Sequence, residues 1–222
     1  MSRPTGRGKG FICMQIQLDP VVSGLFVAAV SYALGMINGA IIISTRKCGS
    51  DVREHGSGNA GLTNFYRCYG KALAAAVIAI DVLKSVVAAL IGALVFRHLG
   101  APLFGKCLAY LFAVVGHTFP AVYGFRGGKG ILTSVGAIAV INWRLCLLLL
   151  AVFAVIVLAT KYVSLGSVIA SACIPAGIWL FCGQDWGATI LCIVTAALMI
   201  WMHRGNIARL LKKQERKLAL SH

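Results

Sequence analysis

Three polar segments that combine glycine with basic side chains interrupt an otherwise apolar chain, at residues 56–67, 116–130 and 203–209. Glycine lets successive backbone N–H groups point into one concavity, where an anion can bind. A lysine or arginine side chain then adds a full positive charge. We call these stretches the first, second and third glycine/basic segments. Together they predict a site for a phosphorylated substrate at the surface of a membrane.

Two familiar nucleotide-binding patterns are present only in part. The first segment contains Gly56-x-Gly58-x-x-Gly61, but an apolar run and a polar stretch precede it, whereas the dinucleotide motif follows a β-strand. The second segment resembles an ATPase phosphate loop with the wrong spacing, and Gly130 stands where a hydroxyl would hold Mg²⁺. We therefore exclude a Rossmann cofactor site and ATP hydrolysis. Any one segment could be a plain basic connector, but three together favour a phosphate site.

The composition predicts an integral membrane protein. The chain has 222 residues, of which 59% are hydrophobic and 12% charged, with a mean hydropathy of +0.86. Soluble domains carry about 25% charged residues. The net charge of +15 lies in loops and tails between apolar runs, as expected for cytoplasmic loops and contacts with anionic headgroups. We expect membrane lipid as a partner and no nucleic acid.

Cysteine and histidine give no sign of a metal or redox centre. No pair among the eight cysteines has CxxC spacing, and most lie in or beside apolar runs, so we interpret them as small hydrophobic side chains. Histidine forms no HExxH pattern or other ligand cluster. We expect neither a metal nor a diffusible cofactor.

Apolar runs that could cross a hydrocarbon layer of roughly 30 Å define the predicted architecture. They cover residues 21–45, 72–96, 103–120, 165–182 and 186–202. Residues 131–160 form either one long tilted helix or two short helices that turn at Asn142-Trp143-Arg144. Two helices would give seven spans, with 14 lysines and arginines on one side and 6 on the other. A single helix would move Lys161 and the basic tail to the opposite side of the membrane and reduce this asymmetry.

The positive-inside rule therefore predicts an all-α integral membrane fold with seven transmembrane helices, the N-terminus outside and the C-terminus cytoplasmic. All three glycine/basic segments then face the cytoplasm. We expect a single domain, 1–222, with an N-terminal tail at 1–20 and a basic tail at 203–222. Arg3, Arg7 and Lys9 would lie outside, against the rule, so Met14 is an alternative start.

Asp81 and Lys84 are the ionisable pair inside a predicted span. They are three residues apart and share one helix face. Intramembrane charges usually mark function. Two roles remain open, mutual neutralisation and the packing or orientation of other groups.

The order of several motifs resembles the PlsY family of bacterial acyl-phosphate-dependent glycerol-3-phosphate acyltransferases. The likeness covers about residues 21–215 and includes the three glycine/basic segments, Asp81-x-x-Lys84 and Ser164-x-x-Ser167. It implies a multi-pass enzyme of the bacterial inner membrane whose site faces the cytoplasm. The implied reaction transfers a fatty acyl group from acyl phosphate to the 1-hydroxyl of glycerol 3-phosphate, which gives lysophosphatidic acid and phosphate in the first step of phospholipid synthesis. A functional link to the enzyme that makes acyl phosphate is also implied.

The same resemblance assigns roles residue by residue. Positions matching the family's catalytic residues are Ser57, Arg67, Lys129, His203 and Asn206. Expected substrate-binding positions are Gly58, Asn59, Thr63, Asn64, His117, Gly127, Gly128 and Gly130. The chain departs from the family pattern at Leu62, Ser85, Arg126 and Lys213, which affects local packing and acyl-chain preference but removes no proposed functional side chain.

A mechanism can be outlined from these residue types. Lys129 and the backbone of residues 127–130 would hold one phosphate and Arg67 the other, while Ser57 and Asn206 would orient the glycerol and polarise the carbonyl. The hydroxyl proton would pass to the acceptor's own phosphate, with His203 or His117 as alternative bases. An acyl-serine at Ser57 ranks last, because no base is near it in the sequence.

Two other classes of function are alternatives. A transporter or channel for a phosphorylated solute would be expected to place polar groups at mid-bilayer on discontinuous helices. A membrane scaffold would not need three phosphate-type segments.

Overall fold

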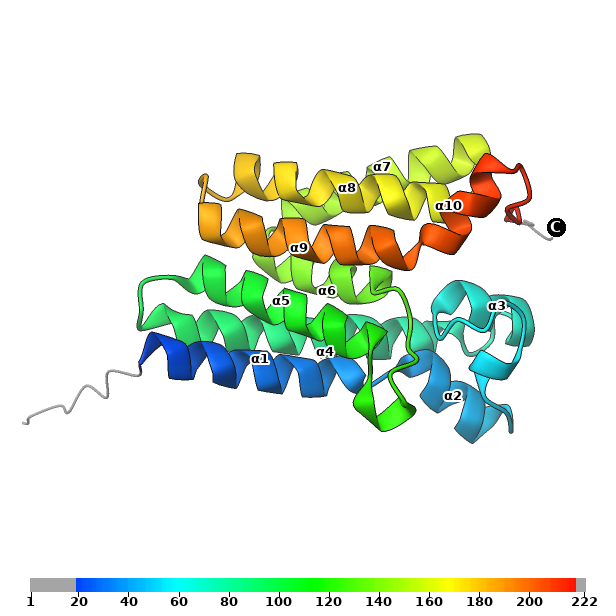
Figure 1. The fold of residues 1–222 in the computed structure, drawn as a ribbon, viewed down its shortest axis with the longest axis horizontal. Helices are drawn as coiled ribbons and strands as arrows, with labels where there is room; N and C mark the ends of the chain where they lie inside the picture. Colours follow the sequence, from blue (N-terminus) through cyan, green and yellow to red (C-terminus); the bar gives the residue numbers. More distant parts are fainter. Residues whose placement is uncertain (1–18, 219–222) are drawn as a thin grey trace, which may run out of the picture.

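The computed structural model describes residues 19–218, which form a bundle of helices (Figure 1). In chain order the elements are α1 (Pro20–Met36), α2 (Gly39–Lys47), η1 (Val52–Glu54), α3 (Leu62–Tyr69), α4 (Ala74–Arg97), α5 (Pro102–Thr118), η2 (Ala121–Tyr123), α6 (Ile131–Ile141), α7 (Trp143–Thr160), α8 (Val163–Phe181), α9 (Trp186–Met202) and α10 (Arg204–Leu211). Arg3, Arg7, Lys9, the alternative start Met14 and nearly all of the predicted tail at 1–20 lie outside the described residues.

Within residues 19–218, five helical segments are long and apolar enough to cross a membrane. They are α1 with α2, α4, α5 with η2, α7 and α8, and a sixth results if α9 and α10, bent by 56°, count as one span. The sequence predicts seven. The difference from five comes from α9, which reaches span length only together with α10, and from α6, which is apolar but has only 11 residues. This helix packs against α4 and α5 on the inside of the bundle.

The uncertain region at 131–160 is two helices, as the charge asymmetry favoured. Asn142 is extended, with φ −156°, and therefore ends α6. Its side-chain oxygen accepts a hydrogen bond from the Leu145 N–H at 3.1 Å and so caps the start of α7. Its amide also donates to the carbonyl of Phe181 at 3.2 Å, which ties this turn to the end of α8.

The predicted span at residues 21–45 is present, but it is not one continuous helix. The chain leaves the helix at Ile37 and Asn38, and α2 starts at Gly39. Nothing in the local sequence requires this break, since the run contains no internal proline. The groups that satisfy the broken backbone come from α4.

Glycine allows α1, α4 and α5 to pack with their backbones in contact. A Cβ atom on Gly35 would collide with the Ala113 backbone, and one on Gly92 would collide with Gly105. Small residues permit the same close approach in other membrane helix pairs. A hydrophobic cluster around Tyr110, Leu145 and Met199 packs α5 against α6, α7, α8 and α9.

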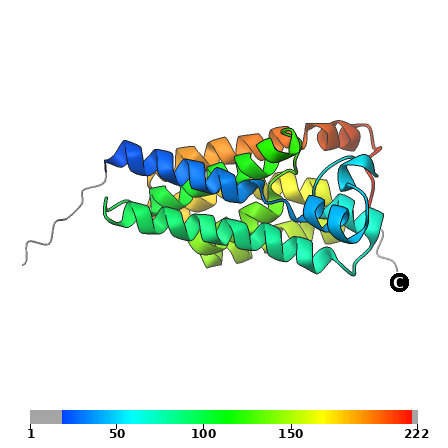
Figure 2. The ribbon, with the colours of Figure 1, turned by 90° about the horizontal axis from the view of Figure 1, so that it is seen from below.

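The three glycine/basic segments gather at one end of the bundle. Figures 1 and 2 show α2, α3, the connection from α5 to α6, and α10 together at this end, with the α4–α5 and α8–α9 turns at the opposite end. The lengthwise helices therefore bring segments that are far apart in sequence to one surface.

Candidate active site

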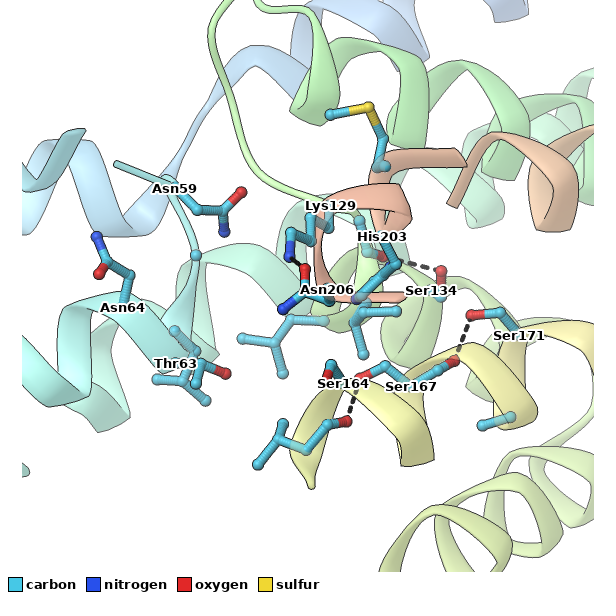
Figure 3. A pocket seen from close by; sticks show the side chains of 18 of the residues that line it. Asn59, Thr63, Asn64, Lys129, Ser134, Ser164, Ser167, Ser171, His203 and Asn206 are labelled. Carbon is cyan, nitrogen blue, oxygen red and sulfur yellow. Dashed lines mark hydrogen bonds between the residues drawn. The ribbon is translucent and has the colours of Figure 1, made fainter. Parts of the chain in front are cut away.

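A cavity of about 830 Å³ lies where the three segments meet (Figure 3). Its polar part is lined by Ser57, Gly58, Asn59, Thr63, Asn64, Arg67, Lys129, Gly130, His203 and Asn206. Its apolar part is lined by side chains of α6, α7 and α8, among them Ile131, Leu132, Val135, Ile138, Leu149, Phe153, Ala170 and Ile174. The cavity thus joins a cationic end to a hydrocarbon-lined end.

Lys129 lies two residues before the start of α6 and is half-buried. Its Nζ atom donates a hydrogen bond to Oδ1 of Asn206. Burial lowers the pKa of Lys129 to about 8; the Glu215 carboxylate works against this shift and the neighbouring Arg209 and Arg67 add to it. A bound phosphate would stabilise this partly desolvated ammonium group.

The start of α6 adds backbone donors beside Lys129. Gly130 has φ +84°, a left-handed conformation that suits glycine, and directly precedes the helix. The first N–H groups of an α-helix have no partner within the helix, and this is where anions bind. Ile131 and Leu132, in that first turn, line the cavity.

Gly127 and Gly128 are placed differently from Gly130. The Gly127 N–H donates to the Thr118 carbonyl at 3.1 Å, and the Gly128 N–H donates to the His117 carbonyl at 3.0 Å. Neither glycine lines the cavity. Their amides therefore close the loop onto the end of α5, while Lys129 and Gly130 face the cavity.

In the first segment, Asn64 organises the loop. Its amide donates to the carbonyls of Val52 and His55, both at 3.0 Å, and its oxygen accepts from the Ser57 N–H at 2.8 Å. The polar atoms of Asn64 are thus engaged with the loop itself, although the residue lies at the cavity wall. The loop then presents Ser57 to the cavity.

The third segment begins at the bend between α9 and α10. His203 Nδ1 lies 2.8 Å from the Met199 carbonyl, which can only accept, so Nδ1 is the donor. In a neutral ring this leaves a lone pair on Nε2. One turn later, Asn206 reaches Lys129, and Figure 3 shows the three side chains together.

Glu215, which the sequence did not single out as a site residue, connects the third segment to α8. Its side chain is 6% exposed and accepts from Ser164 Oγ at 2.9 Å, Asn206 Nδ2 at 2.7 Å and Arg209 Nε at 2.8 Å. These hydrogen bonds lower the pKa of Glu215, although its burial acts in the opposite direction and more strongly than any one of them. A single carboxylate within a tail of basic residues was the available signal.

Arg53 is a second residue that the sequence analysis missed. It pairs with Asp51 at 2.7 Å and donates to the carbonyls of Tyr123 at 2.7 Å and Arg126 at 3.1 Å. These contacts join the stretch that directly precedes the first segment to the second segment. They do not place the guanidinium at the cavity wall.

His117 is buried and lines the cavity. Its Nδ1 atom is 2.8 Å from Lys84 Nζ, and Asp81 also lines the cavity. Among residues 19–218, no group of three His, Cys, Asp or Glu side chains is arranged to hold a metal ion.

Comparison with known proteins identifies the family. Residues 25–213 match the family described as glycerol-3-phosphate acyltransferase. The chain belongs to this glycerol-3-phosphate acyltransferase family. A family member from Clostridioides difficile (strain 630) is 43% identical over 199 residues, covering 89% of this chain and 97% of the relative. One from Thermoanaerobacter sp. (strain X514) is 41% identical over 197 residues, covering 87% and 95%.

Solved structures of the glycerol-3-phosphate acyltransferase family have the same fold. The crystal structure of PlsY, an integral membrane glycerol 3-phosphate acyltransferase, in its glycerol 3-phosphate form matches with a TM-score of 0.80 and 33% identity. The lysophosphatidic acid form matches with a TM-score of 0.77 and 31% identity. Each match covers 89% of this chain and 96% of the solved chain. The all-helical bundle is therefore the architecture of an integral membrane protein of this family.

Proposed function

We propose that the protein transfers a fatty acyl group from acyl phosphate to the 1-hydroxyl of sn-glycerol 3-phosphate, which yields lysophosphatidic acid and inorganic phosphate. The observation that carries the proposal is the single cavity with a cationic end and an apolar end. A phosphorylated acceptor fits the cationic end, and an acyl chain fits the apolar end. Family membership supports both the acceptor and the type of reaction.

The cationic end can hold two phosphates. Lys129 and the first N–H groups of α6 would bind one, because they combine a desolvated ammonium with unpaired backbone donors. Arg67, on α3, also lines the cavity and would bind the other. Ser57 and Asn206 would orient the glycerol and polarise the acyl carbonyl. Holding the reactants in this way could supply roughly 7–11 kcal/mol of the barrier.

The chemistry needs one nucleophile and one good leaving group. The 1-hydroxyl oxygen of glycerol 3-phosphate attacks the acyl carbon, the ester C–O bond forms, and the bond between carbonyl carbon and phosphate oxygen breaks. We assign the hydroxyl proton to the acceptor's own phosphate. His203 Nε2 is the alternative acceptor, since the Met199 carbonyl occupies Nδ1. His117 has Nδ1 engaged by Lys84, and only its Nε2 remains for such a role.

The acyl chain would lie in the apolar part of the cavity between α6, α7 and α8. Among the candidate spans α7 is the least buried by the rest of the protein, since only 22% of its 18 residues are buried. A lipid-facing helix at this position allows chains to enter sideways from the bilayer.

We further propose seven spans, with α6 as the short one, and a cytoplasmic site in the bacterial inner membrane. The gathering of all three basic segments at one end, with 14 lysines and arginines on that side, supports this orientation. A cytoplasmic site could receive donor from the enzyme that makes acyl phosphate.

The transporter alternative gains one feature, the break between α1 and α2, because transporters use discontinuous helices. The ends of this break are bonded to side chains of the same protein, which leaves them unavailable for a solute. Family membership also favours the enzyme.

Phosphate release tests the proposal. Purified protein in detergent or bicelles receives palmitoyl phosphate with and without glycerol 3-phosphate, with palmitoyl-CoA as the control donor. We expect phosphate release only when both palmitoyl phosphate and acceptor are present. Transfer from the thioester instead would overturn the donor, and inactivity of folded protein with every donor would redirect attention to solute flux.

A further inference from the structure

The break between α1 and α2 lies inside a candidate membrane span, where unpaired backbone groups are costly. One ion pair closes both of its ends. Lys84 Nζ donates to the carbonyls of Gly35 at 3.2 Å and Ile37 at 2.6 Å, at the end of α1. Asp81 Oδ1 accepts from the Gly39 N–H at 3.1 Å, at the start of α2. The cation thus meets a helix C-terminus and the anion a helix N-terminus, as the helix dipoles favour.

The pair itself is buried. Lys84 Nζ and Asp81 Oδ1 are 2.8 Å apart, and the two side chains are 2% and 1% exposed. Mutual neutralisation would need only this contact. Lys84 Nζ instead also contacts two carbonyls and a histidine nitrogen, so that its partners come from three helices and the α1–α2 break.

The break directs Asn38 toward the first glycine/basic segment. Asn38 Oδ1 accepts from the Ile41 N–H at 3.1 Å and caps α2, while Nδ2 donates to the Ala60 carbonyl at 3.1 Å. The Ala60 N–H in turn donates to the Gly127 carbonyl at 3.4 Å. A continuous helix through Asn38 could not cap α2 and hold Ala60 in this way. The first and second segments therefore meet at a point that the break supports.

A second route leads from Lys84 to the second segment. Lys84 Nζ is 2.8 Å from His117 Nδ1, and the His117 carbonyl accepts from the Gly128 N–H. The imidazole also lies against Gly128, since a Cβ atom there would collide with His117 Nε2. Lys129 is the next residue. Both routes thus end at the loop that carries the cavity's lysine.

We propose that Asp81 and Lys84 are positioning residues that hold the α1–α2 break and, through Asn38 and His117, set the place of the first segment relative to Lys129. This inference rests on the proposed function for its activity readout. It assigns Asp81 and Lys84 an orienting role. Mutual neutralisation alone does not account for the contacts between Lys84 and the backbone of the break.

The test removes both charges at once. In the Asp81→Asn, Lys84→Met double variant no unpaired buried charge remains, and the amide oxygen introduced on α4 can still accept from the Gly39 N–H. We expect kcat/KM for glycerol 3-phosphate to fall about 100-fold, the loss associated with a misplacement of about 1 Å. Hydrogen exchange at the amides of Ala60 and Gly128 should accelerate, while the α9 core stays protected. Ser85→Ala, in a buried neighbour on α4 that bonds only to its own helix, is the matched control and should change neither quantity.

Wild-type activity and wild-type exchange in the double variant would overturn the proposal in favour of simple neutralisation. If the double variant does not fold, Asn38→Ala decides, because it leaves both charges in place and removes the link to Ala60. We expect the same acceleration of exchange at Ala60 and a similar loss of kcat/KM, and unchanged values would refute the assignment. If the wild-type protein itself fails to use acyl phosphate, the proposed function fails, and the exchange comparison still tests the positioning role.

Discussion

Lys129 Nζ donates a hydrogen bond to Oδ1 of Asn206, although 77 positions separate the two residues. The Asn206 amide group then donates to Glu215, so its orientation is set from both sides. Through this contact the second and third glycine/basic segments share one cation. The arrangement holds Lys129 at the cavity by a hydrogen bond, as a preorganised donor in the proposed site would be held.

Removal of the Lys129 charge should abolish most of the activity without unfolding the protein. We expect Lys129→Met to lower kcat about 100- to 1,000-fold, the range found when one preorganised donor is lost. Phosphate release measures the rate, and the elution profile in detergent verifies folding. Lys71→Met, at an exposed position outside the cavity, is a charge-matched control. Near-normal turnover of the Lys129 variant would contradict the site assignment.

The lowered pKa of Lys129 predicts an alkaline limit to activity. In the proposed site a phosphate would bind the protonated ammonium, and burial lowers the pKa of this group to about 8. As pH rises through that value the cation is lost, so kcat/KM for glycerol 3-phosphate should decline by about tenfold for each further pH unit. Lys129→Arg keeps its charge throughout this range. Its residual activity should lack the decline, and an identical alkaline limb in that variant would assign the ionisation to another group.

A methyl group on Gly128 should displace the loop that carries Lys129. The added Cβ atom would collide with His117 Nε2 and crowd the Ala60 carbonyl. We therefore expect Gly128→Ala to lower kcat/KM by about 10- to 100-fold. At Gly124 the added atom meets nothing within 4 Å, and only the backbone strain of φ +64° remains. Gly124→Ala should thus cost some stability and far less activity, and equal losses in the two variants would argue against the steric explanation.

Much of the site could be predicted from the sequence because its residue types are local signals. Glycine combined with lysine or arginine within a short polar stretch marked all three segments, and the charge asymmetry predicted that they lie on one side. The α1–α2 break was not predictable, because the groups that satisfy it, Asp81 and Lys84, lie on another helix. The role of Asn64 was hidden for a similar reason. An asparagine in a phosphate-type loop suggests ligand binding, whereas here its polar atoms hold the loop.

Loss of the Glu215 carboxylate should affect both stability and activity. Glu215→Gln keeps the shape but weakens three hydrogen bonds, two of them from Ser164 and Arg209. We expect the free energy of unfolding to fall by about 1–3 kcal/mol, which lowers the Tm by several degrees. Activity at a temperature where the variant is fully folded should also fall, because Asn206 loses its orienting partner. Glu54→Gln, an exposed carboxylate on η1, serves as the control. An unchanged Tm would show that the tail contributes little.

Narrowing of the apolar part of the cavity should change the preferred chain length. Ala170 on α8 lines this part, and a phenylalanine there would occupy space between α7 and α8. We expect Ala170→Phe to lower kcat/KM for palmitoyl phosphate several-fold more than for a donor of half that length. A donor series of increasing length measures the effect. Equal loss for all donors would place the acyl chain elsewhere.

The joining of a cationic end and a hydrocarbon-lined end in one cavity has a kinetic consequence. Under the proposed function, the acceptor would arrive from three-dimensional solution and the acyl donor by lateral diffusion in the two dimensions of the bilayer. The quantity that sets the encounter rate for the donor is accordingly its mole fraction among the surrounding lipids. The enzyme's saturation with donor is thus a property of the surface in which it sits, and added inert lipid acts as a diluent even when the total amount of donor is constant.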